Sequence, residues 1–167
     1  MSFAGEIAQW AVLAGLAFLI LGLYRQLGVF LNNSGHSAEN LSGPALRKRA
    51  PDSLYEAVRD SNSTALDTIV AFVSERCQSC SFLLAEIGRA DVTDALGERG
   101  FRIVLVARES SPSFIQALRD TGIPLVVDDG TIWSQCNIQF TPFLVRLDED
   151  GRVLQKAVTH DIDHAFV

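Results

Sequence analysis

Two cysteines, separated by two residues, stand where one apolar run gives way to another. Cys77 and Cys80 follow the strand-like run 68–73 and lead into the helix-like stretch 80–88. At a helix N-terminus the helix dipole and the free backbone N–H groups favour a thiolate, and a second thiol one turn later is close enough to form a disulfide. The spacing therefore predicts a redox-active disulfide, in which Cys77 attacks and Cys80 resolves.

Half of a zinc site and an inert structural disulfide are the two alternative interpretations of this pair. A zinc site would need two further ligands, usually a second cysteine pair or a histidine pair. The other candidate ligands are scattered and not paired at ligand spacing: Cys136, His36, His160 and His164. We therefore favour redox chemistry and expect no bound metal.

The chain has the length of one ordinary domain with an additional apolar segment. It contains 167 residues, and its formal net charge is −6. Acidic and basic residues are mixed and form no basic stripe. Nucleic acid is therefore excluded as an expected partner.

The apolar segment 7–24 carries no formal charge, with Glu6 before it and Arg25 after it. As a helix it would span about 27 Å, close to the thickness of the hydrocarbon core of a bilayer. We predict one transmembrane helix, with a membrane anchor and interfacial extension over 1–31. A cleaved signal peptide is the alternative, but no Lys or Arg precedes the apolar core and no small-x-small cleavage site follows it.

Residues 32–50 are polar and irregular, with many Ser, Asn and Gly residues and no sustained apolar period. This composition is typical of a tether between a membrane segment and a domain. The sequence therefore predicts a flexible linker over 32–50 and a folded domain over 51–167.

Apolar runs beyond residue 50 alternate between the periods of strands and helices. Strands are predicted over 68–73, 101–107, 124–127, 143–147 and 153–158. Helices are predicted over 80–88, 91–98 and 113–121. Asp150 and Gly151 form a strong turn signal between the last two strands. This order predicts an α/β domain with a mixed sheet flanked by helices on both faces.

Four motifs carry a resemblance to a known family. They are the run 25–29 after the apolar segment, the Ala-Pro-Asp sequence 50–52, the dithiol itself and the run 140–151. Together with the order of elements, they resemble the thioredoxin fold. More closely, they resemble the membrane-anchored thiol-disulfide proteins related to TlpA and to the methylamine-utilisation protein MauD.

The resemblance implies that Pro142 follows a cis peptide bond and lies against the dithiol. Thr141 would then offer its backbone to an extended substrate strand. A trans proline that opens an edge strand is the alternative interpretation of Pro142.

The function that the resemblance implies is a membrane-tethered thiol-disulfide oxidoreductase acting on disulfides of exported proteins, with a MauD-like maturation role. Its partners would be protein substrates with cysteines or disulfides and a redox partner that recycles the dithiol. No cofactor is implied. A non-catalytic thioredoxin-fold binding module, either a redox sensor or a metal-delivery scaffold, is the alternative.

Three positions depart from the usual thioredoxin pattern. Arg76 replaces the tryptophan before the first cysteine, Ala71 replaces a buried acid, and Ala85 replaces a helix-kinking proline. A positive charge beside Cys77 favours the thiolate and a more oxidising disulfide, provided that the guanidinium of Arg76 points toward the sulfur.

Cys136 is the third and unpaired cysteine, in a predicted short helix over 133–138 that packs under the sheet. Cysteine is among the most buried residue types, so a core role is expected. A redox partner for the dithiol and a site of intermolecular pairing are the alternatives.

Two arguments about location conflict. Arg25 and the basic run 47–49 follow the apolar segment, which favours a cytoplasmic domain by the positive-inside rule. The family places the domain outside, and a protein that acts on disulfides belongs in an oxidising compartment. We expect a single-pass protein of a bacterial cell membrane, with its domain on the extracytoplasmic, periplasmic side.

Overall fold

The computed structural model describes residues 42–59 and 67–166. The predicted anchor 1–31, with its transmembrane segment 7–24, lies outside the described residues, as does the first part of the predicted linker. Within the described ranges, no helix combines the length and the apolar character needed to cross a bilayer.

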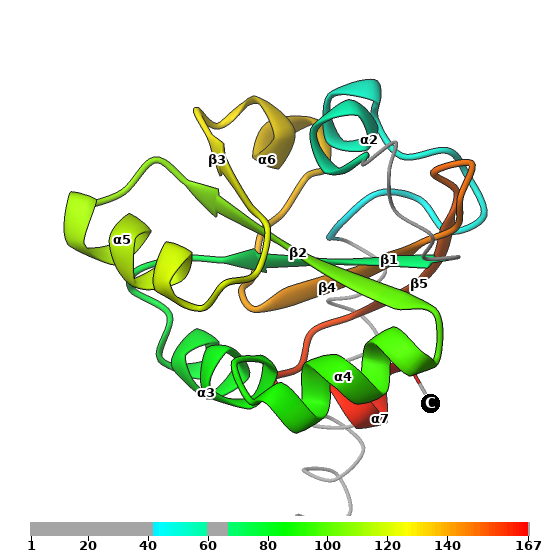
Figure 1. Ribbon diagram of the computed structural model, residues 1–167. Helices are drawn as coiled ribbons and strands as arrows, with labels where there is room; N and C mark the ends of the chain where they lie inside the picture. The colour runs from blue at the N-terminus through cyan, green and yellow to red at the C-terminus, as the bar shows by residue number, and fades with distance from the viewer. Residues whose placement is uncertain (1–41, 60–66, 167) are drawn as a thin grey trace, which may run out of the picture. The chain divides into compact units, whose positions relative to one another are not determined.

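Five strands form one mixed sheet in the order β3-β2-β1-β4-β5. They are β1 Asp67–Val73, β2 Phe101–Arg108, β3 Leu125–Asp128, β4 Phe143–Leu147 and β5 Val153–Ala157. β1, β2 and β3 run parallel, whereas β4 is antiparallel to both β1 and β5 (Figure 1). All five predicted strands are confirmed, with small differences at their ends.

The central strand β1 is buried on both faces of the sheet. Ile69, Ala71 and Val73 point into one apolar core, and Val70 and Phe72 point into the other. A strand covered on both sides needs a continuous apolar run rather than an alternating one, which explains the sequence of β1.

Six helices cover the two faces of the sheet in the described residues. Helices α3 Gln78–Ile87, α4 Ala90–Glu98, α5 Pro112–Asp120 and α7 Ile162–Phe166 contribute to one core. Helices α2 Asp52–Val58 and α6 Thr131–Gln135 contribute to the other. In Figure 1, α3, α4 and α7 lie below the sheet, and α2 and α6 lie above it.

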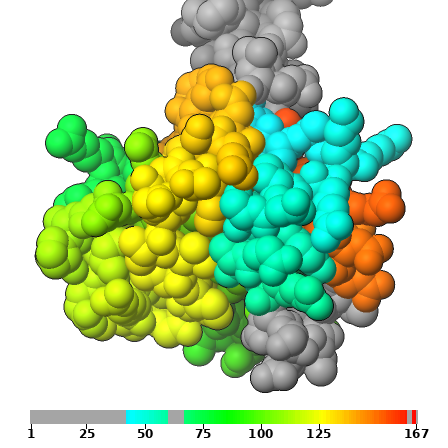
Figure 2. All heavy atoms as spheres, turned by 90° about the horizontal axis from the view of Figure 1, so that it is seen from above, coloured from blue at the N-terminus to red at the C-terminus, as the bar shows by residue number. Residues whose placement is uncertain are grey.

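The three predicted longer helices are present as α3, α4 and α5. The short helix near Cys136 is α6, which begins and ends earlier than predicted. Helix α2 was not predicted, and its buried residues Leu54 and Val58 are its only apolar signal at helical spacing. Figure 2 shows α2 and α6 side by side, where the Ser53 hydroxyl donates to Gln135 Oε1 over 2.7 Å.

Residues 42–50, which the sequence predicts as the end of a flexible linker, are packed on the domain. The Arg47 N–H donates to the Val153 carbonyl over 2.8 Å, and the Val153 N–H donates to the Lys48 carbonyl over 2.9 Å. The described part of the predicted linker therefore belongs to the domain. Polar composition gave no sign of this, because backbone hydrogen bonds leave no mark on a sequence.

Gly43 has the strictest steric requirement in this segment. Its φ is +77°, and a Cβ at this position would overlap the ring of Phe143. We expect Gly43→Ala to lower the free energy of unfolding by about 2–4 kcal/mol, because it adds left-handed strain to overpacking.

The matched control is Gly97→Ala, because Gly97 lies on α4 and a Cβ added there would point into open space. This change should raise the free energy of unfolding by about 0.5–1 kcal/mol through helix propensity. Urea unfolding of both variants measures the difference. Similar effects of the two substitutions would contradict the packing of residues 42–50.

Candidate active site

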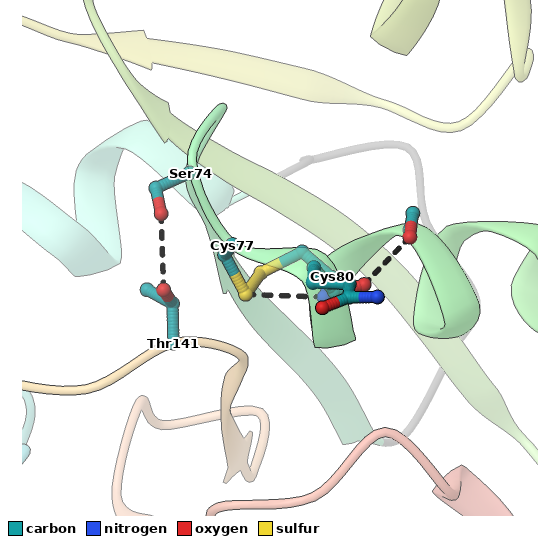
Figure 3. Close-up of a disulfide and its surroundings, with 6 residues drawn as sticks. Ser74, Cys77, Cys80 and Thr141 are labelled. Carbon is teal, nitrogen blue, oxygen red and sulfur yellow. Dashed lines mark hydrogen bonds between the residues drawn. A yellow bond between two sulfur atoms is a disulfide. The ribbon is translucent and has the colours of Figure 1, made fainter.

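Cys77 and Cys80 form a disulfide at the carboxyl end of β1 (Figure 3). Their Cα atoms lie 5.3 Å apart. Cys77 is the N-cap of α3, and its Sγ accepts a hydrogen bond of 3.0 Å from the Cys80 N–H. The predicted strand-to-helix position of the pair is therefore observed.

The two cysteines differ in exposure. Cys80 lies on the inner side of α3 and is buried in the apolar core, whereas Cys77 is half-buried. Cys77 is thus the cysteine that another molecule can reach. Once the disulfide is reduced, the Cys80 N–H and the dipole of α3 are placed to stabilise a thiolate at Cys77.

The peptide bond between Thr141 and Pro142 is cis, as the resemblance implies. The two residues precede β4, which pairs with β1 in the sheet. The Ser74 Oγ and Thr141 Oγ1 atoms lie 3.0 Å apart and share a hydrogen bond beside the disulfide (Figure 3). The fold therefore brings the predicted substrate-binding residues to the loop that carries Cys77.

A second hydrogen-bonded contact holds the same loop from another direction. The Glu75 carboxylate accepts bonds of 2.6 Å from the Ser111 hydroxyl and 3.3 Å from the Ser111 N–H, at the N-cap of α5. These bonds, aided by the charge of Arg76, lower the pKa of Glu75.

Arg76 is exposed, and within 42–59 and 67–166 it makes no hydrogen bond or ion pair. Its guanidinium therefore has no contact in the described structure that would fix it beside the sulfur.

Cys136 has the predicted core position. It has no exposed surface, and it packs in the core under α2 and α6. Burial, with a smaller contribution from the Asp128 carboxylate, raises the pKa of the Cys136 thiol to about 12. The thiol is neutral at physiological pH and inert as a nucleophile.

Metal ligands do not gather in the described part of the chain. No group of three His, Cys, Asp or Glu side chains there is arranged to hold an ion. His36 lies outside the described residues.

Sequence reasoning missed Ser42, which supports the loop that leads to Thr141. Ser42 is fully buried, and its hydroxyl donates to the Asn137 carbonyl over 3.2 Å. The same oxygen accepts a bond of 3.0 Å from the Gln139 N–H. Ser74 was missed as well, and no sequence signal marks either serine, because a single polar residue has no period.

Comparison with known proteins gives one curated relative of note. The methylamine utilization protein MauD of Methylophilus methylotrophus is 23% identical over an alignment of 175 residues, covering 96% of this chain and 79% of that protein. No protein-family model matches the chain.

Similar folds occur among solved structures. The C-terminal domain of an uncharacterized protein from Bacteroides fragilis superposes with a TM-score of 0.53 at 16% identity, covering 69% of this chain and 91% of that one. StoA from Bacillus subtilis gives a TM-score of 0.48 at 19% identity, covering 58% and 76%. At these identities the similarity concerns the fold alone.

The mixed sheet, the disulfide that caps a helix and the cis-proline loop beside it define a dithiol oxidoreductase of the thioredoxin fold. The similarity to MauD extends over almost the whole chain. The chain therefore has a thioredoxin-type fold with a redox disulfide and is similar to MauD over most of its length.

The difference in burial predicts selective alkylation of the reduced protein. A maleimide at neutral pH should label Cys77 in the native state and Cys136 only after denaturation, because the Cys136 thiol is buried and neutral. Mass spectrometry of proteolytic fragments distinguishes the sites. Native labelling of Cys136 at the rate of Cys77 would contradict its core position.

Proposed function

We propose that this chain is a membrane-tethered thiol-disulfide oxidoreductase that makes, breaks or reshuffles disulfides of exported proteins. The observation that carries the proposal is the half-exposed Cys77 sulfur at the start of α3, hydrogen-bonded to the Cys80 N–H and beside the Thr141-Pro142 loop. This arrangement offers one accessible sulfur, one protected sulfur and an adjacent loop for a client.

Exchange would proceed in two steps. In the reducing direction, the Cys77 thiolate attacks a client disulfide, so a Cys77–client bond forms and the other client sulfur leaves as a thiolate. Cys80 then loses its proton and attacks Cys77 Sγ, which restores the Cys77–Cys80 disulfide and releases the first client sulfur. The two electrons come from the dithiol, and oxidation of a client is the reverse sequence. A redox partner must recycle the dithiol after each turnover.

Thr141 would present its backbone to the client. Among the described residues, neither its N–H nor its carbonyl has a backbone hydrogen-bond partner. An extended client segment can pair with these groups by strand addition, and this places its sulfur near Cys77. Pro142 would shape the loop, and the exposed Arg76 would favour the Cys77 thiolate by its charge.

The membrane-tethered part of the proposal depends on the segment 7–24, whose length and lack of charge suit a single-pass anchor. The extracytoplasmic location is supported by the chemistry, because disulfides persist in oxidising compartments. A MauD-like maturation role in methylamine utilisation is supported by the similarity to that relative.

Substitution of each cysteine tests the assigned roles. Cys80→Ser should accumulate mixed disulfides with clients, because Cys77 still attacks but no second thiol resolves the product. Cys77→Ser, the matched control, should trap few. Non-reducing gels after alkylation measure the adducts, and identical patterns for both variants and the wild type would refute the roles.

Labelling in cells tests the location. In spheroplasts, after mild reduction, a membrane-impermeant maleimide should label Cys77 if the domain is extracytoplasmic. Cys136 serves as an internal control, because it should react only after denaturation. Labelling of Cys77 that requires a permeabilised membrane would place the domain in the cytoplasm and overturn the proposed action on exported proteins.

A further inference from the structure

Ser74 and Thr141 occupy opposite positions just beyond the end of the β1–β4 ladder. The last pair of that ladder is Phe72 with Phe143. Continuing the antiparallel register by two residues on each strand places Ser74 opposite Thr141. At this point the contact between the two segments is the hydrogen bond of 3.0 Å between their side-chain hydroxyls, which point toward each other in Figure 3.

The side-chain bond keeps the two loops together without using the main chain of Thr141. Backbone pairing with Ser74 would have consumed the N–H or the carbonyl that a client strand needs. Instead, these groups have no backbone partner in the described structure. The hydroxyl pair therefore holds the loop in register and leaves its hydrogen-bonding edge open.

Ser74 is also connected to the reactive cysteine. Its carbonyl accepts a bond of 3.2 Å from the Cys77 N–H. One residue thus contacts the dithiol through its backbone and the cis-proline loop through its side chain. A movement of Thr141 away from Ser74 would change the position of a bound client strand relative to Cys77.

We propose that Ser74 is a positioning residue for thiol-disulfide exchange with polypeptide clients, acting through Thr141. The inference rests on the proposed function. Exchange needs the attacking, central and leaving sulfurs nearly in line, so the rate depends on how a chain-bound sulfur is presented. A small disulfide can rotate freely into line and does not need the loop.

Two probes with the same leaving group distinguish exchange with a chain-bound sulfur from exchange with a small disulfide. One is a peptide with a single cysteine in an extended segment, held as a mixed disulfide with thionitrobenzoate. The other is free cysteine held in the same way. In both, the Cys77 thiolate of the reduced full chain forms a bond to the cysteine sulfur and releases coloured thionitrobenzoate. Cys80 then displaces the cysteine as a thiol.

Ser74→Ala should slow release from the peptide probe by about tenfold, the factor expected for one lost neutral hydrogen bond. Release from the cysteine probe should stay within about twofold, because the Cys77 thiolate is unchanged. Thr141→Val should reproduce the selective loss, and Thr141→Ser, which keeps the hydroxyl, should restore the peptide rate.

A double variant tests whether the two residues act through one bond. Ser74→Ala combined with Thr141→Val should be no slower than the slower single variant. Ser110→Ala is the matched control, because it removes a half-buried serine hydroxyl whose hydrogen bond within the described residues goes to the Arg108 carbonyl and not to the Thr141 loop. If Ser74→Ala does not fold, the release rates of Thr141→Val and Thr141→Ser with the two probes test the same hydrogen bond.

The outcomes separate this inference from the proposed function. Equal slowing of both probes, or no slowing of the peptide probe, overturns the positioning role of Ser74 while exchange itself persists. If the wild-type chain releases thionitrobenzoate from neither probe, the proposed function itself is wrong.

Discussion

The burial of β1 on both faces is the constraint on which the rest of the structure depends. Its residues alternate between two apolar cores, so a slip of one residue against β2 or β4 would exchange the side chains of both cores. Because the register cannot slip, the carboxyl end of β1 has a fixed position. The short loop after Val73 then delivers Cys77 to the start of α3, and antiparallel β4 brings Thr141 to the same edge.

Elements marked by long apolar runs could be predicted from the sequence, and those held by polar contacts could not. The strands around Val70, Val104 and Val145 have such runs, and all are present. Helix α3 begins earlier than its apolar stretch, because the Cys77 sulfur caps a first turn of polar residues. Helix α2 is too short for its two buried residues to establish a period.

The candidate site also combines residues that could be predicted from the sequence with residues that could not. The dithiol and the Thr141-Pro142 pair are compact motifs, visible in a few consecutive letters. The supporting contacts join residues far apart in the chain: Ser74 with Thr141, Glu75 with Ser111, and Ser42 with Gln139. Single serines of this kind are common in loops, and only the folded sheet shows which ones meet. Residues 42–50 belong to the same category, since their backbone bonds to the last hairpin are invisible in composition.

Glu75 and Arg76 are adjacent in the loop before Cys77 and carry opposite charges, but only Glu75 has a hydrogen-bond partner in the described residues. A carboxylate so near Cys77 would oppose the formation of a thiolate. Glu75, however, is bonded to Ser111 at the N-terminus of α5, where the helix dipole offsets part of its charge. Arg76 makes no hydrogen bond or ion pair within the described residues, but its charge acts on the neighbouring Glu75 carboxylate and helps to lower its pKa. The proposed effect of Arg76 on the Cys77 thiolate therefore depends on the guanidinium turning toward the sulfur, where its charge would make the disulfide more oxidising. Ser111, distant in sequence, holds the Glu75 carboxylate at the start of α5, and the two hydrogen bonds that it donates favour the ionised form of that carboxylate.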